Sequence, residues 1–85
     1  DDADALDSRG YAHQRHGDLD AAIADYSAAI KIDPLYYTAL FGRGVAYAAQ
    51  GKRDLAIADL TAARALNAGV DQYMADKKIL VPAGL

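Results

Sequence analysis

Two histidines offer the clearest possibility of metal chemistry in this sequence. His13 and His16 lie three residues apart in a stretch that we expect to be helical, so both imidazoles could face one side and share a metal ion. His13 occupies an expected packing position, however, no third ligand is obvious, and the chain contains no Cys. We therefore interpret both histidines as core or surface residues and expect no metal and no other cofactor.

Residues that could support catalysis do not form a recognisable set. Ser8 and Ser27 have no base near them in the sequence pattern and no group that would orient one. The run Gly42-Arg43-Gly44 is not a dinucleotide-binding fingerprint, because no strand precedes it and Tyr47 stands where a third Gly would be. We therefore predict that the protein is not an enzyme.

Two kinds of charged residue recur 34 residues apart. Arg9 recurs as Arg43, and we interpret both arginines as structural, through hydrogen bonds or through packing of their aliphatic stems. Asp25 recurs as Asp59, and a solvent-exposed face with local salt bridges explains both aspartates.

Composition narrows the class of partner. The net charge is −3 with a pI near 5.0, which argues against a nucleic-acid partner or an anionic membrane surface. No apolar run approaches the roughly 20 residues of a membrane-spanning helix, so we expect no membrane insertion. Hydrophobic residues make up 53% of the chain and twenty residues are Ala, which indicates a core made by closely packed helices.

The first residue is Asp1, and this permits two interpretations. Either a signal peptide was cleaved before Asp1-Asp2-Ala3, or a longer chain was trimmed to this domain. An acidic beginning that opens a helix suits export. We favour an exported, periplasmic protein of a bacterium over a cytoplasmic one.

The elements that would position these side chains are defined by an internal repeat. A shift of 34 residues aligns thirteen residues of one unit with identical residues of the next, far beyond chance for this composition. The stretch from Gly17 to Pro34 returns as Gly51 to Ala68, and each copy has a Gly turn followed by an amphipathic helix with two adjacent apolar stripes. A helix with two apolar stripes must be covered from two sides, which is typical of stacked repeats.

Helix boundaries follow from the turn residues. Gly17 and Gly51 each end a helix as left-handed caps, Asp18 is an expected N-cap, and Asp33-Pro34 closes the helix before it. The predicted helices run from about Ala3 to His16, Leu19 to Ile32, Leu35 to Gln50, and Arg53 to Leu66.

Glycines inside the first and third helices predict close packing. Gly within a helix costs up to about 1 kcal/mol relative to Ala, so Gly10 and Gly44 need a reason to be there. We expect each to lie where another backbone leaves no room for a Cβ, with Gly10 against Ala22 and Gly44 against Ala56.

The last seventeen residues begin a third unit without completing it. Val70 to about Leu80 can form one helix, with Tyr73 and Met74 on an apolar side. We interpret it as a capping helix that covers the outer stripe of the fourth helix, with residues 82–85 as a loose tail.

The period and the order of residues resemble the tetratricopeptide repeat. The first unit has Leu, Gly, an aromatic position, a turn Gly, Ala, Tyr, Ala and Pro in the order of that family, and the second follows it. The first unit's positions are Leu6, Gly10, His13, Gly17, Ala22, Tyr26, Ala29 and Pro34. The second unit's are Leu40, Gly44, Tyr47, Gly51, Ala56, Leu60, Ala63 and Ala68. His13 replaces the usual aromatic residue and Ala68 the closing Pro, and neither breaks the pattern.

This resemblance implies an all-α fold in which helix hairpins stack as a short right-handed superhelix of about five helices. The single domain of residues 1–85 would then consist of repeat 1 (3–34), repeat 2 (37–68), a capping helix (70–81) and a tail (82–85).

The resemblance also implies a concave groove, lined by the first helix of each repeat, that binds a peptide or helix of a partner protein. Helix geometry places on that side the residues that packing does not use. From the repeats these are Asp4, Asp7, Tyr11, Gln14, Arg15, Thr38, Phe41, Val45, Ala48 and Ala49, and from the capping helix Gln72, Ala75 and Asp76. The predicted binding groove comprises Asp7, Tyr11, Gln14, Arg15, Thr38, Phe41, Val45 and Ala48.

Phe41 is the predicted anchor of the partner. Because the equivalent residue in the first repeat is Asp7, the repeat itself does not require an aromatic side chain there. We expect Phe41 to be at least partly exposed, with Tyr11 and Val45 beside it and Arg15 at the rim.

One subtype of the family can be tested against these residues. Some tetratricopeptide domains grip a chaperone's C-terminal carboxylate with Lys, Asn and Arg. The matching positions here carry Asp7, Tyr11, Gly42, Gln72 and Asp76, which supply no cationic donor, so we expect no such clamp. The sequence thus favours an adaptor or scaffold that binds a protein partner. The alternative is a structural module that self-associates as a homo-oligomer or within a larger assembly.

Overall fold

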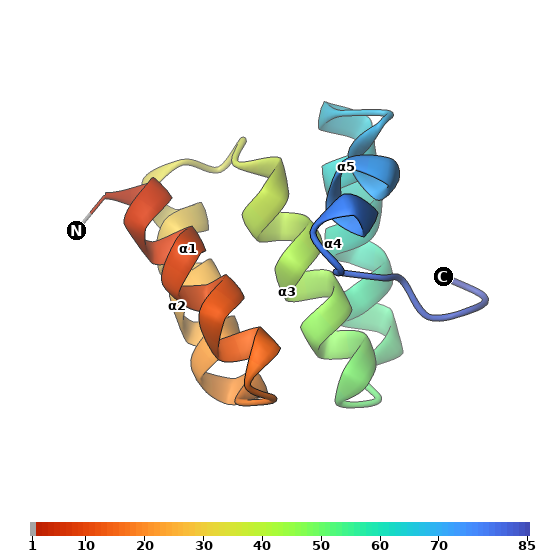
Figure 1. Ribbon diagram of the computed structural model, residues 1–85. Coiled ribbons are helices and arrows are strands. Elements are labelled where there is room, and N and C mark those ends of the chain that lie inside the picture. The colour runs from red at the N-terminus through yellow and green to blue at the C-terminus, as the bar shows by residue number, and fades with distance from the viewer. Residues whose placement is uncertain (1) are drawn as a thin grey trace.

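The computed structural model describes residues 2–85, and the expectation about Asp1 lies outside this part of the chain. The described residues form five α-helices. They are α1 (Ala3–Arg15), α2 (Leu19–Ile32), α3 (Tyr37–Ala49), α4 (Arg53–Leu66) and α5 (Val70–Asp76). Figure 1 shows α1 and α2 as one antiparallel hairpin, α3 and α4 as a second hairpin beside it, and α5 packed against the second pair. The predicted all-α fold of stacked helix hairpins is confirmed.

Both hairpin turns contain a left-handed glycine. After α1, the amides of Gly17 and Asp18 donate to the carbonyl oxygens of Gln14 and His13, and Gly17 has φ of 79°. Gly51 repeats this arrangement after α3, with φ of 78°. Left-handed geometry is costly for residues with a Cβ, so these two glycines set the ends of α1 and α3 as predicted.

Aspartate side chains determine where two helices begin. Asp18 accepts a hydrogen bond from the amide of Ala21 at 3.4 Å and is the N-cap of α2, as predicted. The third helix begins at Tyr37, two residues later than the predicted Leu35. The amide of Leu35 donates instead to the side chain of Asp33 at 3.0 Å, which holds this stretch in a turn.

The core of the first hairpin surrounds the ring of Tyr26, which is 1% exposed. A Cβ at Gly10 would lie 2.9 Å from Cδ1 of Tyr26 and 3.3 Å from the carbonyl oxygen of Ala22, so the predicted close approach at Gly10 is confirmed. In the second hairpin, the atoms nearest to a Cβ at Gly44 belong to Leu60 and Asp59 rather than to the predicted Ala56. Leu60 is the repeat equivalent of Tyr26, so in both hairpins the larger side chain rests on the helix glycine.

The C-terminal region differs most from the prediction. α5 ends at Asp76 rather than near Leu80, because Lys78 adopts a left-handed φ of 66° and turns the chain away from the helix axis. The tail is not loose either. Arg53 donates to the main-chain oxygen of Gly84 at 3.0 Å, and Arg64 donates to that of Leu85 at 2.9 Å.

Candidate functional site

The first helix of each hairpin and α5 form one continuous side of the molecule, which we call the concave face. Figure 1 shows α1, α3 and α5 next to one another, with α2 and α4 behind them. Hydrogen bonds join α1 to α3 across this face. The hydroxyl of Thr38 donates to the side chain of Asp7 at 3.1 Å, and the side-chain amide of Gln14 donates to the carbonyl oxygen of Gly42 at 3.2 Å. Among the predicted groove residues, Asp7 and Thr38 are thus in contact, whereas Gln14 contacts the backbone of α3 one turn further along.

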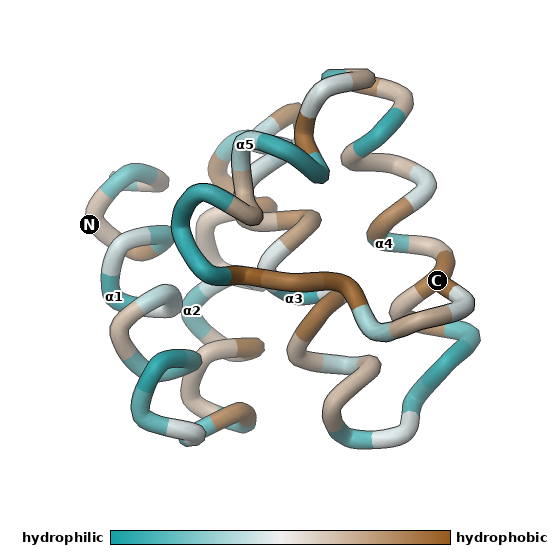
Figure 2. The backbone as a smooth tube through the Cα atoms, turned by 45° about the vertical axis from the view of Figure 1, so that its right-hand side comes forward, coloured by the Kyte–Doolittle hydropathy of each residue, from teal (hydrophilic) through white to brown (hydrophobic). Residues whose placement is uncertain are grey.

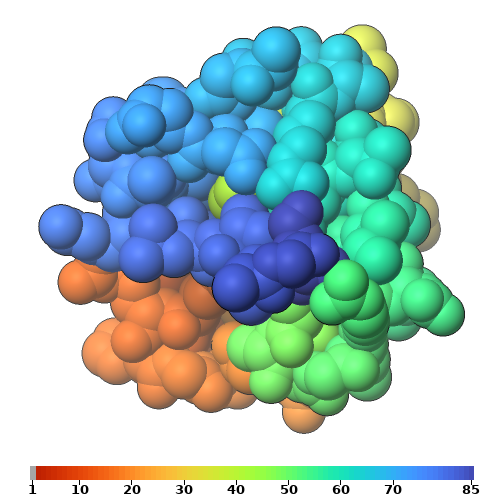
Figure 3. Space-filling view, turned by 90° about the vertical axis from the view of Figure 1, so that its right-hand side faces the viewer, coloured from red at the N-terminus to blue at the C-terminus, as the bar shows by residue number. Residues whose placement is uncertain are grey.

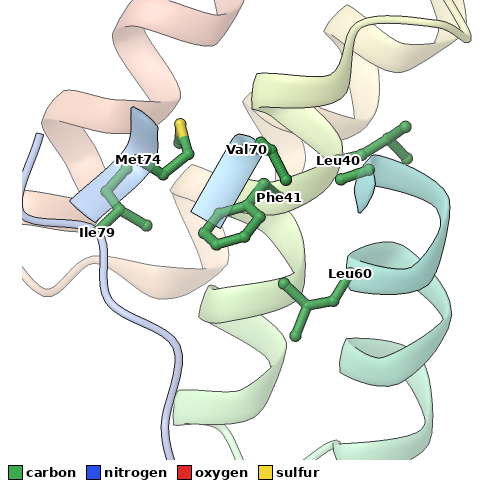
Figure 4. Packing of buried hydrophobic residues seen from close by; sticks show 7 residues of the cluster. Leu40, Phe41, Leu60, Val70, Met74 and Ile79 are labelled. Carbon is green, nitrogen blue, oxygen red and sulfur yellow. The ribbon is translucent and has the colours of Figure 1, made fainter. Parts of the chain in front are cut away.

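Phe41 does not have the predicted exposure. Its side chain is 0% exposed and belongs to a buried cluster with Val70, Met74 and Ile79. Figure 4 shows the ring pointing into the space between α3 and the C-terminal residues. The expectation of an exposed anchor is therefore wrong. Phe41 is covered by α5 and by the chain that follows α5.

The chain after α5 crosses the concave face. In Figure 2 a hydrophobic stretch, Ile79 to Val81, runs in front of α3, and Figure 3 shows the C-terminal residues lying on the surface between the first hairpin and α4. The hydroxyl of Tyr11 donates to the main-chain oxygen of Lys77 at 2.8 Å, and Arg15 donates to the same hydroxyl at 3.0 Å. Of these two predicted groove residues, Tyr11 therefore binds the segment and Arg15 binds Tyr11.

On one side of the crossing segment lies an open hollow of about 380 Å³, which we call the acidic hollow. Its lining combines carboxylates, tyrosine rings and one lysine. The side chains that matter most for its chemistry are Asp4, Asp7, Tyr36, Tyr37, Tyr73 and Lys77.

Asp7 is partly buried in the acidic hollow, whereas Asp4 and Asp33 are exposed. Burial raises the pKa of Asp7 above its ordinary value, although the hydrogen bond from Thr38 and the charge of Lys77 oppose that shift. Tyr36 donates its hydroxyl to Asp4 at 3.0 Å, and burial together with this bond raises the pKa of Tyr36 to about 12. A cationic group would relieve the cost of the buried Asp7 carboxylate, and the tyrosine rings would pack against its aliphatic part.

On the other side of the crossing segment lies a second hollow of about 310 Å³. It is lined by α1 and α3 residues together with the crossing segment. The lining includes Gln14, Arg15, Val45, Ala49, Lys78 and Leu80. Arg15 and Lys78 make this hollow cationic, so the two ends of the concave face carry opposite charge. The predicted residue Ala48 is half-buried on α3 and does not line either hollow.

The recurring arginines and aspartates form ion pairs inside each hairpin. Arg9 donates two hydrogen bonds of 2.8 Å to Asp25, and Arg43 repeats this pattern with Asp59 at 2.7 and 2.9 Å. The structural interpretation of the arginines is confirmed. The solvent-exposed interpretation of the aspartates is wrong, because Asp25 is 7% exposed and Asp59 is 6% exposed.

The two histidines have different surroundings. His16 is exposed at the end of α1, whereas Nε2 of His13 lies 3.6 Å from the carboxylate of Asp25. Within the described residues, no three His, Cys, Asp or Glu side chains group as a metal site would require. Nor does any described helix have the length and apolar character to span a membrane.

Several residues of the site were missed by sequence reasoning. Tyr36 and Tyr37 are not among the predicted groove residues, but both line the acidic hollow with Tyr73. Their position at the beginning of α3, directly before the groove residue Thr38, was the available signal. Lys77 is also absent from the predicted groove, and it lines the acidic hollow where the chain turns at Lys78.

Comparison with known proteins agrees with the repeat architecture. A family model described as tetratricopeptide repeat matches residues 8–71, which is most of the chain. No significant match was found among curated proteins or among solved structures. Tetratricopeptide repeats are generally protein–protein interaction modules and are typically non-enzymatic. Because this match covers α2, α3 and α4 in full and most of α1, the chain belongs to the tetratricopeptide repeat family.

Proposed function

We propose that this domain binds an extended segment of a partner protein along the concave face, without a carboxylate clamp. The family is generally one of protein-binding modules. The concave face carries two hollows, of about 380 and 310 Å³, separated by a segment that occupies its apolar middle. Such a surface suits a polypeptide that lies across several helices better than it suits a small molecule in one enclosed cavity.

The observation that carries this proposal is the acidic hollow. Burial raises the pKa of Asp7, which accepts a hydrogen bond from Thr38 in a hollow that Tyr73 also lines. A carboxylate in this environment favours a cationic ligand. We therefore propose that the partner segment places a lysine or arginine side chain in the acidic hollow.

A peptide library displayed on phage tests this proposal. Selection against the immobilised full chain is expected to enrich peptides that carry Lys or Arg near apolar residues. Asp7→Asn keeps a hydrogen-bond acceptor for Thr38 but removes the charge, and should weaken binding of the selected peptides about tenfold, as loss of one partly buried charge pair would.

The matched control is Asp54→Asn, which makes the same charge change on the exposed beginning of α4. It should leave the affinity of the selected peptides unchanged. Selection of no peptide, or equal loss of affinity with both variants, would contradict binding at the acidic hollow.

Self-association is a second candidate, favoured by one feature of α4. Leu55 and Leu66, which are eleven residues apart and therefore on the same side of α4, are 49% and 42% exposed. A contact between copies through α4 would leave the concave face free. Sedimentation equilibrium of the native chain and of Leu55→Asp tests it: a dimer that Leu55→Asp converts to monomer supports the contact, and a native monomer at high micromolar concentration excludes it.

A further inference from the structure

The segment from Lys77 to Leu85 runs across the concave face and ends against α4, in a conformation that no repeat unit requires. α5 ends in the same hydrogen-bond pattern as α1 and α3, with the amides of Lys78 and Ile79 donating to Ala75 and Met74. Here, however, the left-handed position is held by Lys78, with φ of 66°, and not by a glycine. The turn that sends the segment across the face is therefore the strained one of the three.

Polar contacts hold the main chain of this segment at both ends. Tyr11 donates to the main-chain oxygen of Lys77, Arg53 to that of Gly84, and Arg64 to that of Leu85. All three bonds run from side chains of the helices to main-chain oxygens, which any extended polypeptide presents. This is the kind of contact by which a groove holds a peptide regardless of its sequence.

Apolar side chains of the segment supply the middle of the contact. Ile79 is 5% exposed within the cluster that contains Phe41, and Val81 packs against the same cluster. Leu80 lies between them and is 64% exposed. The alternation of inward and outward side chains is that of an extended chain lying on a surface.

Lys77 brings the segment's charge to the acidic hollow. Its ammonium nitrogen lies 5.0 Å from the centre of the Tyr73 ring, and its charge acts on the Asp7 carboxylate. The segment thus presents a cation to the acidic hollow. Two and four residues later it presents branched apolar side chains to the cluster that contains Phe41.

We propose that residues 77–85 are an internal ligand of the concave face, which a partner segment of the same chemistry displaces. This inference rests on the proposed function. The displacing segment is an extended peptide with a lysine or arginine followed, two and four residues later, by branched apolar side chains. Until it binds, the segment covers Phe41 and keeps the apolar middle of the face closed.

Hydrogen exchange on the native chain tests whether the segment opens independently. The amides of Lys78 and Ile79 should exchange with protection at least tenfold lower than amides in the middle of α3, because they are released when the segment leaves while the hairpins stay folded. Equal protection would mean that the segment opens only with global unfolding, and would overturn the proposal.

A peptide added in trans tests whether the face binds this chemistry. The probe is a fluorescein-labelled peptide with the sequence of residues 77–85, followed by anisotropy. The full-length double variant Ile79→Asp and Val81→Asp should release its own segment and bind the probe at least tenfold more tightly than the native chain does. As a control, Leu80→Asp alters the exposed residue between Ile79 and Val81 and should bind the probe as the native chain does. A second control is a probe peptide with aspartate in place of Ile79 and Val81, which should bind neither the double variant nor the native chain.

Three results would overturn the internal ligand. One is equal affinity of the probe for the double variant and the native chain, and another is loss of the helical circular-dichroism signal in the double variant. The third is binding of a library-selected peptide without any loss of protection in residues 77–85, which leaves the proposed function intact. Failure to select any peptide, even with the double variant, would instead overturn the proposed function.

Discussion

The ring of Tyr26 lies so close to the backbone of Gly42 that a Cβ at position 42 would be 2.5 Å from Cζ of that ring. The hydroxyl of Tyr26 donates to Gln14 at 2.6 Å, and Gln14 donates onward to the carbonyl oxygen of Gly42 at 3.2 Å. Because Tyr26 is on α2, Gln14 on α1 and Gly42 on α3, this contact joins the two hairpins. The angle between them depends on a residue that has no side chain.

Gly42→Ala should therefore destabilise the protein by about 1–3 kcal/mol, because the added methyl group must push the Tyr26 ring or separate the hairpins. Urea unfolding followed by circular dichroism measures the change. Ser8→Ala, at the equivalent and exposed place in the first repeat, should have little effect. Combining Gly42→Ala with Tyr26→Leu, the residue type of Leu60, should recover part of the loss, and an unchanged urea midpoint for Gly42→Ala alone would contradict the close contact.

Phe41 is a core residue, so its truncation should affect folding before it affects binding. Phe41→Ala is expected to cost about 3–5 kcal/mol, which is a large part of the roughly 4–13 kcal/mol expected for a domain of this length. Thermal denaturation should show a strongly lowered or lost transition. Val45→Ala, which removes less from a half-buried position on the same helix, should retain a cooperative melt. A native-like melting temperature for Phe41→Ala would contradict its burial.

The repeat register predicted the four helices of the two hairpins well. It did not predict the course of the C-terminal residues that cover α3. A 34-residue period predicts which residues of α1 and α3 face the same side, and Asp7 and Thr38, which it placed there, are hydrogen-bonded to each other. Phe41 was placed on that side too. Its burial depends on Ile79 and neighbouring residues, which have no equivalent in the repeat, so no internal comparison could reveal it.

The sequence contains a signal for the ion pairs that appears only when the arginines and aspartates are considered together. Arg9 and Asp25 are 16 residues apart, and Arg43 and Asp59 have the same separation. Opposite charges that recur together at a fixed separation predict a pair inside each hairpin, and a paired carboxylate tolerates burial. The separate interpretation of each residue left the aspartates in solvent.

Two carboxylates should give the stability of this domain opposite dependences on pH. The hydrogen bonds from Arg9 hold the pKa of Asp25 below its usual range. A folded-state pKa below the unfolded one adds stability that is present above about pH 4 and is lost as the pH falls through the folded value. Asp25→Asn should cost about 1 kcal/mol at pH 7, because the Arg9 partner is exposed, and should flatten the loss of stability in acid. An acid limb identical to that of the native chain would contradict the pairing.

Asp7 should act in the other direction. Burial raises its pKa in the folded state, so its carboxylate disfavours folding at neutral pH, and that cost is relieved as the pH falls through the raised folded-state value. Asp7→Asn should raise the melting temperature at pH 7 while weakening the binding of cationic peptides. Gain of stability with loss of binding is typical of a residue kept for function, and a lowered melting temperature would show that Asp7 is structural.

Lys78 is the non-glycine residue with positive φ among residues 2–85. It occupies the same position after α5 that Gly17 occupies after α1 and Gly51 after α3. A residue with a Cβ costs roughly 1–2 kcal/mol in this conformation, and Gly removes that strain. Part of the stability gained is lost again, because Gly has more conformational freedom in the unfolded chain. Lys78→Gly should therefore stabilise the domain by about 0.5–1 kcal/mol, or a few degrees in melting temperature. Lys77→Gly, one residue earlier at ordinary negative φ, should give no gain. If the turn at Lys78 is what makes the segment easy to release, Lys78→Gly should also raise the protection of the Ile79 amide, and a chain that is destabilised by this glycine would show that the left-handed turn does not form.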